Sequence, residues 1–246
     1  MKPIELIKQT ADKIHGFLSD VEGEFLYYSA KSCTGKGVIV EIGPFKGKSS
    51  VWLGKGSKSG RNVKIYAVDP FVETDEYKKS CGAASILEEF RKNIKDADID
   101  DIVVPIAKTS EDAESGWSEP VELLWVDGAH ECEMVKLDFE LWFPHLIDDG
   151  IIAFHDTIVE TGPRRVVKEF IFNSNYFKDV GCAGSITFAR KVSRNSVKDR
   201  MRSKYVLFLQ DIYVFSSRLK LPRLIKNMGT KIRKIAQGGN YLKGTR

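Results

Sequence analysis

Glycines, carboxylates and imidazoles follow four short apolar runs of this chain, at the point where each run ends. In a parallel α/β sheet the carboxyl ends of the strands meet at one edge, and ligands bind there. The four clusters therefore predict one crevice in which a small molecule is bound and transformed. They are Gly43 and Gly47 after residues 38–42, Asp69 after 63–68, Asp127 and His130 after 121–126, and His155 and Asp156 after 150–154.

Hydrophobic periodicity predicts the elements that position these residues. Alternating strands and helices indicate an α/β fold with a Rossmann-like, doubly wound sheet. The sheet is expected to have seven strands, mostly parallel, with an antiparallel terminal strand. In the helix expected over residues 131–146, one face is formed by Met134, Leu137, Leu141 and His145. The strands are expected at 38–42, 63–68, 102–106, 121–126 and 150–154, and in a strand–glycine–strand element over 176–190.

The two ends of the chain differ from this central part. Residues 1–35 have helical spacing and are expected to form an N-terminal helical cap on a domain of residues 36–190. Residues 190–246 contain 16 Lys and Arg and 2 acids, so the preceding residues carry a net charge of −10 although the whole chain carries +4. Residues 191–246 are therefore expected to form a basic, partly amphipathic helical extension.

This basic tail has several open interpretations. Lys and Arg interleaved with Leu and Ile are typical of a helix that lies on a membrane surface. The tail is equally compatible with docking on the acidic body or on a second copy in a homo-oligomer. Nucleic acid is the least favoured partner, because nucleic-acid readers more often add exposed aromatic side chains.

Bulk composition is that of a soluble globular protein, with 42% apolar and 29% charged residues. No run approaches the roughly 18–20 apolar residues that span a bilayer, and the first residues lack the apolar block of a signal peptide. We expect a cytoplasmic protein, with peripheral contact at the inner membrane face as the alternative. The cysteines (Cys33, Cys81, Cys132 and Cys182) are far apart, which argues against a zinc ribbon or a disulfide framework.

The glycine-rich turn after the first strand matches neither common nucleotide motif. A phosphate loop needs four residues between its first glycine and Gly-Lys-Ser, and only three lie between Gly43 and Gly47. The dinucleotide fingerprint fails because Phe45 stands where its second glycine should be. What remains is an acid at Glu41 followed by two spaced glycines.

That pattern resembles the first motif of class I S-adenosylmethionine-dependent methyltransferases. The resemblance implies that Gly43 and Gly47 let the backbone approach the amino-acid end of the cofactor, since a side chain there would block it. It places Glu41 near the cofactor's ammonium and Asp69 on the ribose hydroxyls. Ser110, after the third strand, is expected to line the adenine pocket.

Two further motifs sharpen the resemblance. Residues 126–130, VDGAH, and 154–157, FHDT, are similar to those of the family that includes the macrolide-sugar O-methyltransferases. Membership would imply methyl transfer to a hydroxyl of a sugar, glycan or related small metabolite. Asp127 and His130 are then the expected catalytic residues, with His130 as general base, a role that suits a neutral imidazole.

A divalent metal is a further expectation. Asp127 and Asp156 follow strands that are adjacent in the predicted order, so both carboxylates can bind one Mg²⁺ or Mn²⁺. The relatives carry an acid where this chain has His155. Three alternatives follow: a weaker site on the two aspartates, a transition metal that also takes His155, or no metal, with His130 or His155 as the base.

Two other function classes remain open. One is a non-catalytic binding module that keeps the S-adenosylmethionine fold. The other is a nucleic-acid methyltransferase that uses the basic tail, although the Pro-Pro motif of amino-methylating nucleic-acid enzymes is absent after the fourth strand.

Overall fold

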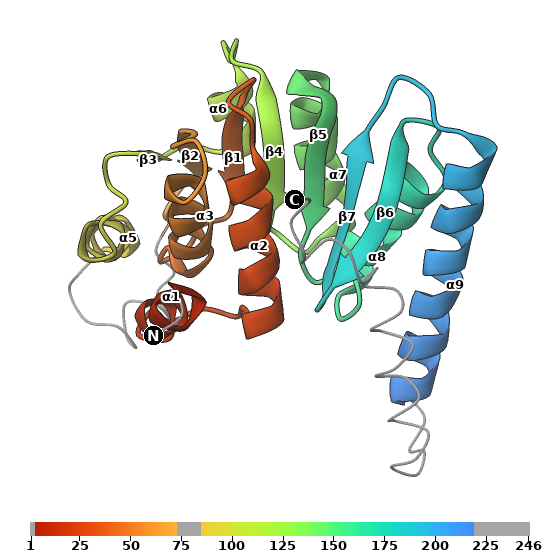
Figure 1. The fold of residues 1–246 in the computed structure, drawn as a ribbon, viewed down its shortest axis with the longest axis horizontal. Helices are drawn as coiled ribbons and strands as arrows, with labels where there is room; N and C mark the ends of the chain where they lie inside the picture. The colour runs from red at the N-terminus through yellow and green to blue at the C-terminus, as the bar shows by residue number, and fades with distance from the viewer. Residues whose placement is uncertain (1–2, 73–84, 219–246) are drawn as a thin grey trace.

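A computed structural model describes residues 3–72 and 85–218, and Figure 1 shows their arrangement. A 7-stranded sheet forms the centre, in the order β3-β2-β1-β4-β5-β7-β6. The strands from β3 to β5 pair in parallel, and β7 runs antiparallel to both β5 and β6. The predicted fold is confirmed. The strands are β1 Val38–Ile42, β2 Ile65–Val68, β3 Val103–Ile106, β4 Val121–Val126, β5 Leu146–Phe154, β6 Phe177–Ala183 and β7 Ile186–Lys191.

Helices cover both faces of this sheet. One core layer packs α1, α2, α3 and α5 against alternate strand residues such as Ile39 and Trp125. The other packs α7, α8 and α9 against the opposite residues, such as Val40 and Leu124. Because both faces are covered, the central strands are continuously apolar rather than alternating. The helices are α1 Pro3–Ala11, α2 Asp20–Ser32, α3 Lys48–Lys58, α5 Ile86–Asp96, α6 Ser110–Glu114, α7 Cys132–Trp142, α8 Thr161–Val166 and α9 Val197–Arg218, with a 3-10 turn at Phe143–His145 and a π-helical turn at Val167–Phe172.

The N-terminal helices are part of the main core. A capping box begins α2, in which the backbone N–H and the hydroxyl of Ser19 both donate to Glu22 Oε2 at 2.7 Å. Gly23 then lets α2 approach α3, because a Cβ at that position would lie 2.3 Å from the Trp52 ring. The division of the chain at residues 35 and 190 remains a prediction.

Helix α7 buries a different face from the apolar one predicted. Val135, Phe139 and Trp142 are buried, whereas Met134 is 47% exposed. Phe139 and Trp142, four and seven residues after Val135, bury more apolar area than Met134 and the two leucines would. These two aromatic residues therefore determine which side of α7 faces the sheet.

Some expectations lie outside the described residues. The irregular segment 71–82, a candidate lid in the sequence, falls mostly there, as do Cys81 and the basic tail beyond residue 218. Among the helices that the structure describes, none is long and apolar enough to cross a membrane.

Candidate functional site

The predicted polar clusters meet at the carboxyl edge of the parallel strands. Backbone hydrogen bonds continue the ladder beyond the strand ends, since the N–H groups of Gly43, Asp127 and His155 donate to Val68 O, Ile42 O and Val126 O at 2.9 Å. The loops after β2, β1, β4 and β5 therefore lie side by side, in the order in which their strands pair.

The turn after β1 requires glycine at its first position. Gly43 has φ +80°, and a Cβ there would lie 2.3 Å from the carbonyl oxygen of Asp127. Gly47, with φ +91°, forms the N-cap of α3, and its Cβ would contact the Phe90 ring at 3.2 Å. The loop is thus held against both the β4 loop and α5, with a bare backbone at its turns.

Glu41 lies beneath this loop and has no exposed surface. Its two carboxylate oxygens accept hydrogen bonds from the hydroxyls of Ser49 and Ser50 at 2.5 and 2.6 Å. Burial raises the pKa of Glu41 to about 7, although the two serines oppose the shift. In the structure, Glu41 therefore links β1 to α3 through these two hydrogen bonds. Its contact with a cofactor remains a prediction.

Asp69 links the first two loops. One carboxylate oxygen accepts the N–H of Phe45 at 3.3 Å, and the other accepts the N–H of Phe71 at 2.6 Å. Burial raises the pKa of Asp69, against the effect of these two backbone hydrogen bonds. The carboxylate is partly exposed at the strand end, where it can accept further hydrogen bonds from a ligand.

Ser110 is positioned by residues of α7. The indole N–H of Trp142 donates to Ser110 Oγ at 2.8 Å, and Ser110 is hydrogen bonded to the carboxyl of Asp138. Asp138 is buried, which raises its pKa to about 6. From the sequence alone, Asp138 is expected either to be solvated or to lie behind the residues that contact a ligand. In the structure it is buried and hydrogen bonded to Ser110.

His155 is buried between three carboxylates. Its Nδ1 lies 2.9 Å from Asp127 Oδ1 and 3.3 Å from Asp156 Oδ2. Its Nε2 lies 3.6 Å from Glu22 Oε2. Burial would lower the pKa of His155, but interactions with Asp127, Asp156 and Glu22 outweigh it and raise that pKa to about 12. His155 is therefore an imidazolium whose two nitrogens both face carboxylates.

Glu22 is the member of this cluster that sequence reasoning missed. Besides its cap at Ser19, it accepts the N–H and hydroxyl of Ser185 at 2.6 and 2.9 Å. Burial alone would raise the pKa of Glu22, but His155 and these donors lower it to about 2. The capping-box pattern marks a helix start and gives no signal of a contact with residues 155 and 185.

His130 differs from His155 in exposure. Its side chain is 49% exposed, and its Nε2 lies 3.4 Å from Asp156 Oδ2. Gly162 of α8 allows the close approach that fixes the loop, because a Cβ there would lie 2.0 Å from the His130 carbonyl oxygen. An open cleft of about 440 Å³ borders His130. It is lined by His130, Glu131, Cys132, Glu133, Thr161, Gly162 and Arg165.

A metal-ligand arrangement exists at the same edge. Within the described residues, Asp127, His130 and Asp156 bring one ligand atom each within 4.8 Å of one another. Two carboxylates and one imidazole suit Mn²⁺ or another transition metal better than Mg²⁺, which prefers oxygen ligands. His155 lies outside this group, since both of its nitrogens face carboxylates.

Residues 40–157 match the model of a family described as a methyltransferase domain. These residues span β1 to the end of the β5 loop and contain most of the site. The match confirms the enzyme class predicted from the sequence, a methyltransferase. The narrower resemblance to macrolide-sugar enzymes is not confirmed by the comparisons.

Solved structures share the fold. An O-methyltransferase from Bacillus cereus in complex with SAH (S-adenosylhomocysteine) is 17% identical with a TM-score of 0.54, covering 78% of this chain and 91% of that chain. The O-methyltransferase TomG from Streptomyces achromogenes, involved in tomaymycin synthesis and in complex with SAM (S-adenosylmethionine), is 14% identical with a TM-score of 0.54 and the same coverage. An SAH-bound methyltransferase from Podospora anserina is 13% identical with a TM-score of 0.59, covering 78% of this chain and 89% of that chain. At these identities the likeness establishes the fold.

Proposed function

We propose that this protein is an SAM-dependent O-methyltransferase that methylates a hydroxyl of a sugar, glycan or related small metabolite. The methyltransferase domain match and the cofactor-bound proteins of the same fold support the cofactor. The observation that carries the O-methylation proposal is the meeting of the glycine turn, Asp69 and an exposed His130–Asp156 pair at one sheet edge. Gly43, Gly47, Asp69 and Ser110 line the cofactor side, with Glu41 beneath.

In this proposal His130 takes the proton of the acceptor hydroxyl. The acceptor oxygen forms a bond to the methyl carbon as the bond from that carbon to the sulfonium sulfur breaks. SAH leaves as a neutral thioether, and the proton of the hydroxyl remains on His130. Asp156, 3.4 Å from His130 Nε2, stabilises the imidazolium that forms. The chain's main task is to align the two reactants, because the displacement needs no covalent intermediate with the protein.

His155 does not serve as the base in this mechanism. Because the pKa of His155 is raised to about 12 by the neighbouring carboxylates, its imidazole is protonated at neutral pH and has no lone pair to accept a proton. Its role is to fix the two aspartates by charge and hydrogen bonding. This favours His130 over His155 among the sequence-based alternatives.

The residues also fit a divalent metal. Asp127, Asp156 and His130 would hold it, and when bound it would lower the pKa of a coordinated acceptor hydroxyl. If His130 binds the metal, it is no longer free to act as a base. EDTA should therefore abolish turnover on the metal-dependent route and leave turnover unchanged on the metal-free route.

The test is methyl transfer from radiolabelled SAM to a panel of sugar nucleotides, free glycosides and catechols, with EDTA or added Mn²⁺. We expect turnover with at least one hydroxylated acceptor, and a loss of about 10²–10⁴-fold in kcat for His130→Ala. The matched control is His145→Ala, whose imidazole belongs to a separate pair with Glu114. Equal turnover of both variants would reject His130 as the base.

A further inference from the structure

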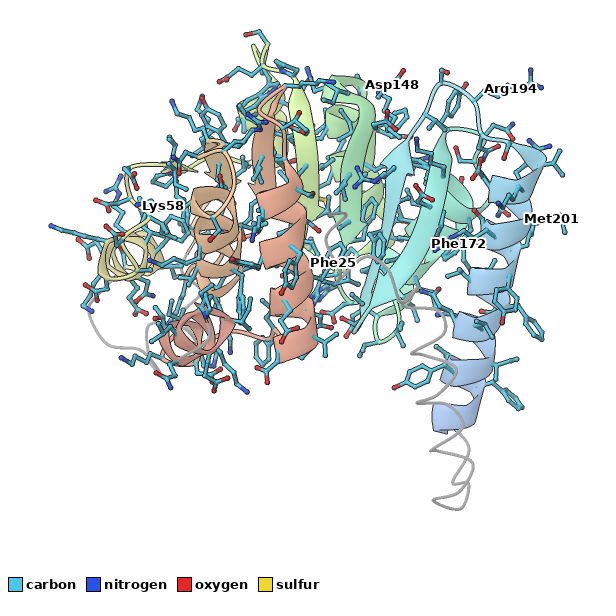
Figure 2. The ribbon with its side chains drawn as sticks, in the orientation of Figure 1. Phe25, Lys58, Asp148, Phe172, Arg194 and Met201 are labelled. Carbon is cyan, nitrogen blue, oxygen red and sulfur yellow. The ribbon has the colours of Figure 1, made fainter. Side chains whose placement is uncertain are left out.

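Helix α9 has an apolar face on each side. Its inner face packs Val206 into the core layer on that side of the sheet, and Leu209 is also buried. Its outer face exposes Met201, Tyr205 and Phe208, at 68%, 52% and 60%. Val197 and Phe215 extend this outer stripe in both directions, at 63% and 66% exposed. Figure 2 shows Met201 on the side of α9 that faces away from the sheet.

The spacing of these residues makes them one continuous surface. Positions 197, 201, 205, 208 and 215 follow one another at intervals of 4, 4, 3 and 7 residues, so they lie along a single line on the helix. A stripe of this length on a helix that already packs by its other face is unusual for a surface that contacts only water.

The charges beside the outer stripe are positive. Lys198 and Lys204 are both exposed and, by helical spacing, flank the stripe on opposite sides. Asp199 caps the helix through Ser196, and Asp211 is paired with Arg164 and Lys168. The acids of α9 are therefore engaged mainly by other groups, although Asp199 also interacts by charge with Lys198 and offsets part of the positive charge there.

The sequence continues this pattern beyond the described helix. Residues 219–246 contain 8 Lys and Arg and no acid, with leucine and isoleucine between them. Electrostatic attraction of basic residues to anionic lipids adds to the burial of apolar side chains at the headgroup level. Tyrosine suits that depth because its ring is apolar and its hydroxyl can stay hydrated, and phenylalanine adds apolar area.

We propose that the outer face of α9 is a docking surface for an anionic lipid bilayer. Pairing of this face with a second copy is less favourable, because the flanking lysines of two copies would meet each other. The carboxyl end of α9 projects beyond the sheet on the side where α1 lies (Figure 1). Gly16, in the connection between α1 and α2, accepts a hydrogen bond from Lys48, which follows the glycine turn directly. The end of α9 therefore projects on the same side of the molecule as the proposed catalytic edge. The proposal does not rest on the methyl acceptor.

The test is co-sedimentation of the full-length protein with phosphatidylcholine vesicles that contain or lack phosphatidylglycerol. We expect binding to the anionic vesicles and at least about tenfold weaker binding to neutral ones. Met201→Ser and Phe208→Ser should each weaken binding by about tenfold, because each removes a side chain that would be buried in the interface. The matched control is Met134→Ser, on the exposed face of α7, which should bind as the wild type does.

Two outcomes would overturn the proposal. One is the absence of vesicle binding, or binding that neither α9 variant weakens, which would assign any attraction to the tail charges alone. The other is a dimer by analytical ultracentrifugation that the same variants dissociate while vesicles are not bound, which would make a second copy the occupant. Because the substituted side chains are exposed, thermal unfolding should show that all three variants fold.

Discussion

At the scale of single residues, a buried histidine joins the loops of the proposed catalytic edge. His155 stands where the resemblance to the macrolide-sugar enzymes predicts an acid, and it lies within 3.3 Å of both Asp127 and Asp156. Glu22 reaches the same imidazole from α2 and also holds Ser185. A buried ion pair gives little net stability, but removing one partner is costly. The cluster therefore serves mainly to fix geometry.

Glu22→Gln tests this cluster by removing one charge without changing the size of the side chain. We expect a loss of about 1–3 kcal/mol in the free energy of unfolding at pH 7, because His155 keeps two of its three carboxylates. Glu24→Gln makes the same change on the same helix and should cost less than about 0.5 kcal/mol. Denaturant titration of both variants measures the difference.

The same variant has a pH signature. The folded-state pKa of Glu22 is lowered from 4.5 to about 2, so its stabilising contribution is present above pH 4.5 and is lost as the pH falls towards 2. The stability gap between wild type and Glu22→Gln should therefore narrow over this window. A gap that stays constant from pH 7 to pH 2 would contradict the ionised Glu22.

Asp138→Asn should change the stability of the protein in the opposite direction from Glu22→Gln. Burial raises the pKa of Asp138 from 3.8 to about 6, so the folded state binds the proton more tightly and stability falls as the pH rises from 3.8 through 6. Asparagine mimics the neutral acid and can still accept from Ser110. We expect a gain of about 1 kcal/mol at pH 8 and none at pH 4, measured as the change in Tm. Equal effects at both pH values would show that charge is not the cause.

At the scale of elements, the turn after β1 is the least replaceable segment of the site. Gly43→Ala should destabilise the fold by about 3 kcal/mol or more and weaken SAH binding, because the new Cβ would lie 2.3 Å from the Asp127 carbonyl oxygen. Gly116→Ala is the matched control. It has a similar φ of +88° but no atom within 4 Å of the new Cβ, so it should lose only about 1 kcal/mol. Similar losses would show that φ alone matters.

Most elements of the site could be predicted from the sequence. Buried parallel strands leave apolar runs, and β1 and β4 have the predicted bounds, 38–42 and 121–126. The start of β5 was predicted less well, since this strand begins at Leu146 rather than at residue 150. The face of α7 could not be predicted as easily. Apolar residues lie on several sides of that helix, and packing rather than periodicity selects Phe139 and Trp142.

At the scale of the whole molecule, the sequence predicted which loops meet but not every residue that joins them. Gly43, Asp69, Asp127, His155 and Asp156 follow strands, so topology alone brings them to one edge. Glu22 lies on a helix outside that rule, and its contact with Ser185 spans 163 positions. A cytoplasmic location and a homo-oligomer remain predictions.

The central claim is that this fold binds an S-adenosyl cofactor at the edge built by Gly43 and Asp69. Calorimetric titration of the full-length protein with SAH tests it most directly. We predict binding in the micromolar range, and at least about tenfold weaker binding for Asp69→Ala, which removes the expected ribose contact. A sample that unfolds cooperatively but shows no heat of binding, or an Asp69→Ala variant that binds as tightly as the wild type, would contradict the account.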